Sequence, residues 1–154
     1  MIKIMFVCHG NICRSPMAEF VLKDMVNKTG FSKQFQISSS ATSCDELGNS
    51  VYPPVRRLLN EKGIDAGGKY SVQLKKSDYE KYDMFIGMDS ANIRNMHRIF
   101  GSDPENKIRK MMDFTSRGGD VADPWYTRDF DITYRDIHEA CEGILKITTG
   151  KVEK

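Results

Sequence analysis

Short apolar segments alternate with segments of helical periodicity along the chain. Four segments have the apolar and β-branched residues typical of buried strands: 2–7, 35–39, 82–88 and 108–112. Helical spacing of apolar residues predicts helices over 16–28, 51–62, 90–100 and 130–148. Strands that alternate with helices form a parallel sheet, because each crossover lays a helix on the sheet. We therefore expect a three-layer α/β fold, a four-stranded parallel sheet flanked by helices on both faces.

The composition limits the classes of protein to which the chain can belong. Its 154 residues favour a single domain over 1–154, and its net charge of +2 gives no reason to expect a nucleic acid or a membrane as partner. No apolar run approaches the roughly 20 residues that span a bilayer, and the N-terminus lacks a signal-peptide cleavage site. We expect a cytoplasmic monomer, although no residue sets the oligomeric state.

The cysteines indicate neither a disulfide framework nor a metal site. In a reducing compartment four cysteines do not form structural disulfides. Neither they nor the three histidines have metal-ligand spacing, so no metal or other cofactor is expected. The cysteines are Cys8, Cys13, Cys44 and Cys141.

The sequence CHGNICRSP follows the first predicted strand directly and precedes the first predicted helix. Ser15 and Pro16 are typical of an N-cap and a first helical position. A loop of this kind turns backbone N–H groups inward, and the helix N-terminus adds partial positive charge. We expect this loop to bind phosphate or another oxyanion, with these residues: Cys8, His9, Gly10, Asn11, Ile12, Cys13, Arg14 and Ser15.

Cys8 and Arg14 give this loop a chemical role. The planar guanidinium of Arg14 can bind two oxygens of a tetrahedral anion, and Gly10 and Asn11 tolerate unusual backbone angles. A cysteine at the base of such a positive field ionises readily, and its thiolate is an in-line nucleophile for a bound phosphate. The alternative, a buried structural Cys8 beside a surface Arg14, does not explain the rest of the motif.

A thiolate that attacks phosphorus needs an acid to protonate the departing oxygen. Asp123 is the best candidate, because Pro124 stiffens the loop over 117–128 and extends the backbone before it. Trp125 and Tyr126 are expected to form an aromatic wall for a phenyl ring. A simple loop-capping role for Asp123 remains an equal alternative. Other aspartates compete for the acid role: Asp113, Asp120 and Asp129.

Two motifs identify a resemblance to a known family. The C-x-G-N-x-C-R-S-P string over 8–16 and the Asp-Pro-aromatic string over 123–125 resemble those of the low-molecular-weight protein tyrosine phosphatases. Segment 82–89 resembles that family's strand ending in Met-Asp, and 39–43 with 48–49 resembles its second loop. The similarity covers essentially the whole chain, and the family's four-stranded parallel sheet agrees with the alternation described above.

The resemblance implies a hydrolase of phosphotyrosine-containing proteins that uses no cofactor. It implies that Cys8 forms a phosphocysteine, that Arg14 stabilises the transferring phosphoryl group and that Asp123 acts first as acid, then as base. Asn11 and Ser15 would hold the loop in shape, and Ser39 resembles the serine that braces it. The resemblance also implies that Cys13 forms a reversible disulfide with Cys8. An inert, packed Cys13 is the equal alternative.

The chain departs from the family pattern at the rim of the expected cleft. His9 stands where an aliphatic residue is frequent. It is expected at the substrate cleft with Asp45, Glu46, Trp125 and Tyr126, as an exposed loop residue; the alternative is that it tunes Cys8 or the substrate rim. Asp45 stands at a position that is often aromatic. With Glu46, it predicts an acidic rim that repels acidic peptides.

Three other functions are compatible with parts of the pattern. An arsenate reductase would need two further cysteines roughly seventy to eighty residues after Cys8, and 70–100 contains none. A phosphotyrosine-binding module would not need Cys8, Arg14 and Asp123 together. A phosphatase for phosphoarginine or a small phosphomonoester stays open, because Ile12 does not decide between substrates.

Overall fold

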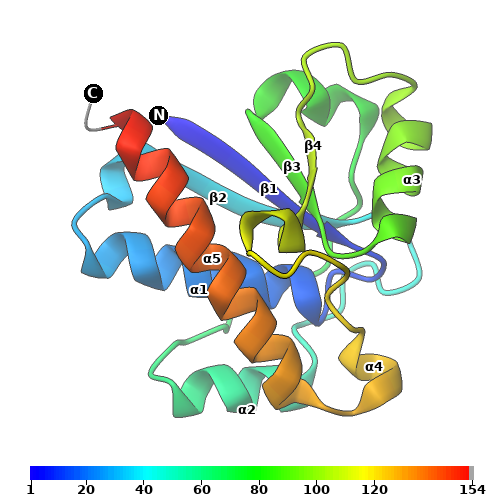
Figure 1. Ribbon diagram of the computed structural model, residues 1–154. Helices are drawn as coiled ribbons and strands as arrows, with labels where there is room; N and C mark the ends of the chain where they lie inside the picture. The colour runs from blue at the N-terminus through cyan, green and yellow to red at the C-terminus, as the bar shows by residue number, and fades with distance from the viewer. Residues whose placement is uncertain (153–154) are drawn as a thin grey trace.

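The computed structural model describes residues 1–152 and contains a four-stranded parallel sheet in the order β2-β1-β3-β4 (Figure 1). Its strands are β1 (Ile2–Cys8), β2 (Phe35–Ala41), β3 (Met84–Gly87) and β4 (Ile108–Lys110). β1 pairs with both β2 and β3, so it occupies the middle of the sheet. The expected parallel α/β fold is confirmed.

Helices cover both faces of the sheet (Figure 1). One face packs against α1 (Arg14–Lys28) and α5 (Phe130–Val152), with α2 (Pro53–Glu61) beside α5. The other face packs against α3 (Ser90–Phe100) and the 3-10 helix η2 (Lys76–Lys81). Shorter helices complete the chain: η1 (Ser32–Gln34), η3 (Met111–Phe114) and α4 (Pro124–Thr127).

The side chains of β1 alternate between two hydrophobic cores. Ile4 and Phe6 belong to the core under α1 and α5, whereas Met5 and Val7 belong to the core under α3. A strand in the middle of a two-sided sheet is buried on both faces, which explains why its sequence is apolar at consecutive positions. The same alternation turns Cys8, the last residue of β1, toward the face covered by α1.

Several predicted boundaries differ from those of the structure. The predicted strand 108–112 ends at Lys110, and the chain continues into η3. The predicted loop 117–128 contains α4, which Pro124 opens at its first position, where a missing N–H costs nothing. The predicted helix 51–62 is shorter because Pro53 starts it at the same kind of position.

Gly143 sets the distance between α5 and η3. A Cβ atom at this position would overlap the carbonyl oxygen of Phe114, so only glycine allows the two helices to approach this closely. Since η3 precedes the segment that leads to Asp123, this contact helps to fix one end of that segment.

Across residues 1–152, the structure has no helix whose length and apolar character would let it cross a membrane.

Candidate active site

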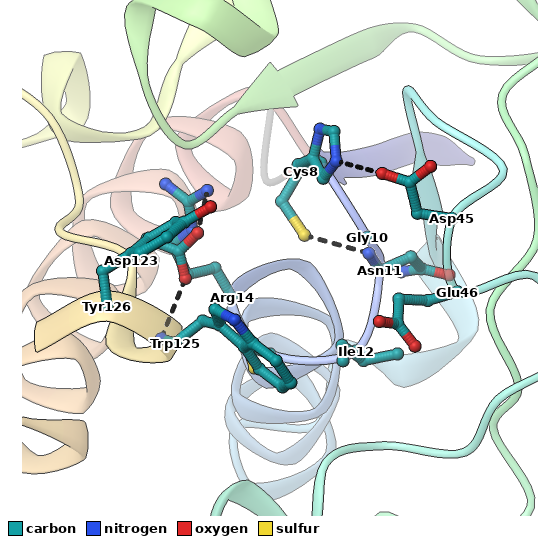
Figure 2. A pocket seen from close by; sticks show the side chains of 12 residues that line it. Cys8, Gly10, Asn11, Ile12, Arg14, Asp45, Glu46, Asp123, Trp125 and Tyr126 are labelled. Atoms are coloured by element: carbon teal, nitrogen blue, oxygen red, sulfur yellow. Dashed lines mark hydrogen bonds and ion pairs between the residues drawn. The ribbon is translucent and has the colours of Figure 1, made fainter. Parts of the chain in front are cut away.

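A pocket of about 180 Å³ opens beyond the carboxyl ends of the strands (Figure 2). The loop after β1 forms its floor, the loop after β2 forms one wall, and α4 with the residue before it forms the opposite wall. The structure thus brings the two predicted loops to one rim. The pocket is lined by Cys8, His9, Gly10, Asn11, Ile12, Cys13, Arg14, Asp45, Glu46, Asp123, Trp125 and Tyr126.

The thiol of Cys8 lies at the floor of this pocket and is almost fully buried. Its Sγ atom is 3.0 Å from Ser15 Oγ and accepts a hydrogen bond from the backbone N–H of Asn11 at 3.3 Å (Figure 2). The loop therefore places two hydrogen-bonding groups against the Cys8 sulfur.

Asn11 holds the loop in shape. Its backbone adopts a left-handed conformation with φ of 59°, which asparagine tolerates better than most residues. Its side-chain Nδ2 donates to Ser15 Oγ at 2.8 Å and to Ser39 Oγ at 2.9 Å, while Oδ1 accepts from the N–H of Val72 at 3.2 Å. This buried amide therefore connects the loop to β2 and to the segment after α2.

The hydrogen bonds around Asn11 also fix the direction of two hydroxyl protons. Ser39 donates its hydroxyl proton to the carboxylate of Glu19, at 2.5 Å, so its oxygen is free to accept from Asn11. Ser15 accepts from the second proton of the same amide, so its own hydroxyl proton is free to point at Cys8 Sγ. The network thus ends in a donor aimed at the sulfur.

Arg14 is buried at the start of α1, with its guanidinium between β3 and the segment before α4. Nη1 donates to Asp89 Oδ2 at 2.7 Å and to the carbonyl oxygen of Val121 at 2.9 Å, and Nη2 lies 3.5 Å from Asp123 Oδ2. Burial disfavours the charged guanidinium, but Cys8 and the two carboxylates outweigh it and raise the pKa of Arg14. Arg14 is therefore a fixed cation beside the pocket floor.

Asp89 orients Arg14 from the end of β3. Its Oδ1 caps α3 by accepting from the N–H of Asn92 at 2.8 Å, and its other oxygen binds Arg14. Burial favours the neutral carboxyl group, but the hydrogen bonds from Arg14 and Asn92 hold the pKa of Asp89 below its ordinary value. The carboxylate is thus both a helix cap and an anchor for the guanidinium.

Asp123 faces the Cys8 loop from the opposite wall of the pocket (Figure 2). Its backbone is extended, with φ of −80° and ψ of 112°, as the following proline predicts. Its Oδ1 also caps α4 by accepting from the N–H of Trp125 at 3.0 Å. The capping role and a position at the pocket are therefore compatible.

The competing aspartates lie elsewhere. Asp120 pairs with Lys110 at 2.9 Å, and Asp129 accepts from the N–H of Ile132 at 3.0 Å. Asp113 lines a separate groove beside β4. None of the three lines the pocket that contains Cys8, whereas Asp123 does.

The rim combines aromatic and acidic side chains. Trp125 packs against Tyr52 with ring centroids 4.9 Å apart, which fixes one wall, whereas Tyr126 is 81% exposed. On the other wall, Asp45 Oδ2 lies 2.8 Å from Nε2 of His9, and both side chains are exposed. Glu46 lies above Gly10. His9 is exposed and lines the pocket.

Comparison with known proteins agrees with this geometry. The family model described as "Low molecular weight phosphotyrosine protein phosphatase" matches residues 3–154. The chain is 36% identical over 150 residues to a Schizosaccharomyces pombe protein with that name, covering 94% of this chain and 96% of the relative. It is 32% identical over 147 residues to the low molecular weight protein-tyrosine-phosphatase YfkJ of Bacillus subtilis, covering 94% of each chain.

The chain belongs to the low molecular weight phosphotyrosine protein phosphatase family. It is an enzyme of this class, and solved structures agree with that assignment. The crystal structure of YfkJ superposes with a TM-score of 0.94 over 98% of this chain and 96% of that chain, at 31% identity. The low molecular weight protein tyrosine phosphatase of Streptococcus pyogenes superposes with a TM-score of 0.86 over 95% and 92%, at 39% identity.

Two features of this phosphatase site differ from what the sequence predicts. Ser15 does not cap α1, which begins at Arg14 with Cys13 as its N-cap; the Ser15 hydroxyl bonds Cys8 instead. Glu19 and Asp89 are not among the site residues predicted from the sequence. Asp89 carries a readable signal, because an aspartate at a strand end with a polar side chain three residues later is typical of a helix cap. Glu19 carries none, since its pair with Lys23 is an ordinary i, i+4 contact on α1 and its other partners come from β2 and from the segment after α2.

The remaining cysteines differ in exposure. Cys13 is buried against the pocket floor, and burial, followed by the charges of Cys8 and Asp123, raises the pKa of its thiol to about 12. Cys141 is fully buried in α5, which raises the pKa of that thiol further. Cys44 is exposed. Neither Cys44 nor Cys141 lines the pocket, so neither is placed as a further redox partner of Cys8.

The pair between Arg14 and Asp89 generates a pH-dependent prediction. Because the folded-state pKa of Asp89 lies below its unfolded value, the pair stabilises the fold above about pH 4, and this stabilisation is lost as the pH falls through the folded-state pKa. We expect Asp89→Asn to lower the free energy of unfolding by about 1–3 kcal/mol at pH 6, with the deficit shrinking toward pH 3. Urea unfolding of the wild type and of Asp89→Asn between pH 3 and pH 6 measures this difference in the free energy of unfolding.

Asp120→Asn is the matched control, because Asp120 forms an exposed pair with Lys110. Exposed pairs contribute about 0–1 kcal/mol, so this variant should stay close to the wild type. A deficit for Asp89→Asn that does not change with pH would show that the carboxylate charge is not what stabilises the site.

Proposed function

We propose that this protein is a metal-independent protein tyrosine phosphatase that hydrolyses phosphotyrosine and other aryl phosphates through a phosphocysteine on Cys8. The observation that carries the proposal is the position of Cys8 Sγ. It lies at the floor of a pocket that also receives the guanidinium of Arg14 and, from the opposite wall, the carboxyl group of Asp123. This is the set that phosphoryl transfer to a cysteine requires.

In the first step the Cys8 thiolate attacks phosphorus, and the bond between phosphorus and the phenolic oxygen breaks. Asp123 gives its proton to the departing oxygen, so the product leaves as a neutral phenol. The inward N–H groups of residues 9–14 and the guanidinium of Arg14 bind the phosphoryl oxygens, where negative charge is concentrated. The result is a phosphocysteine and a carboxylate at Asp123.

In the second step a water molecule attacks the phosphorus of the phosphocysteine. Asp123 now takes a proton from this water, and the bond between sulfur and phosphorus breaks to regenerate the Cys8 thiolate. Ser15 and the N–H of Asn11 stabilise the thiolate as a leaving group, because both are placed to donate to Sγ. Phosphate then leaves, and the cycle returns to its starting charges.

The walls of the pocket favour an aromatic leaving group. Trp125, fixed by its contact with Tyr52, and the exposed Tyr126 provide faces for a phenyl ring, and stacked rings attract each other beyond their area of contact. Asp45 and Glu46 line the opposite wall. Phosphotyrosine in a protein segment without acidic neighbours is therefore the proposed substrate.

We also propose the domain organisation, cellular location and oligomeric state of the enzyme. We place the whole chain, 1–154, in one catalytic domain that acts as a cytoplasmic monomer, without a nucleic acid or a membrane as partner. The hydrophobic cores on the two faces of one sheet support a single domain across the described residues.

The first test is hydrolysis of p-nitrophenyl phosphate in the presence of EDTA. We expect turnover by the wild type and none by Cys8→Ser, because a serine hydroxyl is a much weaker nucleophile at neutral pH than a thiolate. Cys44→Ser, which changes an exposed cysteine away from the pocket, should keep full activity. No turnover by folded, reduced wild type would favour a phosphotyrosine-binding module instead.

The role of Asp123 is tested by changing the leaving group. Asp123→Ala should slow the hydrolysis of aryl phosphates with poor leaving groups by about 10²–10⁴-fold, because these need a proton most, and should slow activated esters much less. A series of substituted phenyl phosphates measures the dependence. Equal losses for good and poor leaving groups would remove Asp123 from the acid role.

We also propose that Cys13 protects Cys8 through a reversible disulfide. Peroxide would oxidise the Cys8 thiolate to a sulfenic acid, and the Cys13 thiol would then displace water to form the disulfide. The high pKa of Cys13 keeps it a thiol until this step. A thiol reductant should restore the activity of peroxide-treated wild type and of Cys44→Ser, but not of Cys13→Ser. Equal recovery in all three would show that Cys13 has no such role.

A further inference from the structure

A second groove, with a volume of about 420 Å³, lies at the β2 side of the sheet, and residues 37–40 of β2 line it. We call it the lysine groove, because Lys23, Lys69, Lys75 and Lys81 line it. Lys23 comes from α1, and the other three come from the segment between α2 and β3. It shares no lining residue with the pocket that contains Cys8.

The positive charge of the lysine groove is only partly balanced. Glu19 lines the groove and forms ion pairs with two of the lysines. Lys23 Nζ lies 2.5 Å and Lys69 Nζ lies 3.8 Å from its carboxylate. Within residues 1–150, Lys75 and Lys81 form no ion pair with any carboxylate. Asp78 also lines the groove, but it accepts from the backbone N–H of Lys75. Four cations therefore face two carboxylates, which leaves a net positive charge.

Lys69 is the least solvated of these lysines, since its side chain is only 14% exposed. Burial lowers the pKa of Lys69, and the neighbouring charge of Lys23 lowers it further, against the attraction of Glu19. Its Nζ also donates to the carbonyl oxygen of Ser39 at 2.7 Å. Within the described residues, the half-buried ammonium group of Lys69 has one carboxylate partner, Glu19, which it shares with Lys23, so it gains from an additional anionic partner.

Hydroxyl groups line the same groove. Ser38, Ser40, Ser77 and Tyr82 belong to it, and the Tyr82 hydroxyl lies 3.2 Å from Ser38 Oγ. The Oγ of Ser40 is buried without a hydrogen-bond partner within the described residues, which is unusual for a buried polar atom. Ammonium and hydroxyl donors together are the groups that bind phosphate oxygens.

We propose that the lysine groove binds a small anion that carries two or more phosphate groups. Lys23 and Lys81 come from α1 and η2, which pack against opposite faces of the sheet, so an anion with several phosphate groups suits this set of lysines better than a single phosphate. The groove volume lies in the range of small-molecule sites, which is about 300–1,000 Å³. Inorganic polyphosphate and nucleoside triphosphates share this chemistry. The site is separate from the proposed phosphatase reaction.

The test is isothermal titration of inorganic tripolyphosphate into three proteins at about 0.15 M ionic strength, where charges are screened beyond about 8 Å, each with orthovanadate present to fill the Cys8 pocket. The wild type is compared with Lys75→Gln/Lys81→Gln, which removes the two unpaired cations of the groove. The control is Lys33→Gln/Lys76→Gln, which removes the same charge from exposed lysines that do not line the groove. Lys76 is the sequence neighbour of Lys75, so the control is close in space as well as in charge.

We expect the groove variant to bind tripolyphosphate roughly tenfold or more weakly, and the control to bind like the wild type, because charge-assisted contacts act over short range. Equal weakening of both variants would show general attraction to a basic surface and would overturn the proposal. So would the absence of binding once orthovanadate is present, since all binding would then belong to the Cys8 pocket.

A second titration with ATP distinguishes the two sources of the anion. Binding that also depends on Lys75 and Lys81 supports a nucleotide ligand, whereas binding of tripolyphosphate alone supports inorganic polyphosphate. Thermal melting of each variant confirms that the fold is kept, as expected for exposed lysines. These titrations measure binding and not turnover, so their result does not depend on whether the proposed phosphatase reaction is correct.

Discussion

The side-chain amide of Asn11 is the interaction on which the site depends. Its two protons and its oxygen are used by Ser15, Ser39 and the N–H of Val72, which come from three parts of the chain. An amide so placed cannot rotate without leaving buried polar atoms unpaired, at a cost of about 1–3 kcal/mol each. The loop that surrounds Cys8 is therefore rigid before any substrate arrives, and rigid donors stabilise a developing charge without reorganising.

Two carboxylates outside this loop, one after β3 and one on α1, orient residues of the loop through hydrogen bonds. Asp89, at the end of β3, orients Arg14 toward the pocket. Glu19, on α1, orients Ser39 and, through Asn11, the proton of Ser15. Both carboxylates act through another residue, and each is held by a cation, Arg14 or Lys23. The proposed catalytic groups are thus the centre of a larger polar network, and the lysine groove lies at its outer edge.

Most of the fold follows from local patterns in the sequence. The alternation of buried strands with amphipathic helices predicts the parallel sheet, and α3 spans 90–100, as its helical periodicity predicts. Boundaries are wrong where tertiary contacts prevail over local signals. Ser15 and Pro16 look like a helix start, yet α1 begins one residue before Ser15, because the Ser15 hydroxyl serves Cys8 and Pro16 still lies in the first turn, where no N–H is needed.

The sequence by itself determined the family, the sheet and the proposed nucleophile, because a phosphate-binding loop is local: its residues are consecutive and their spacing carries the chemistry. Only the tertiary structure decided which aspartate faces Cys8, which carboxylate orients Arg14 and that Glu19 braces the loop. These contacts join residues that are distant in the chain, as in the pairs of Arg14 with Asp89 and of Asn11 with Ser39. Their geometry depends on how strands and helices pack, which no local pattern records.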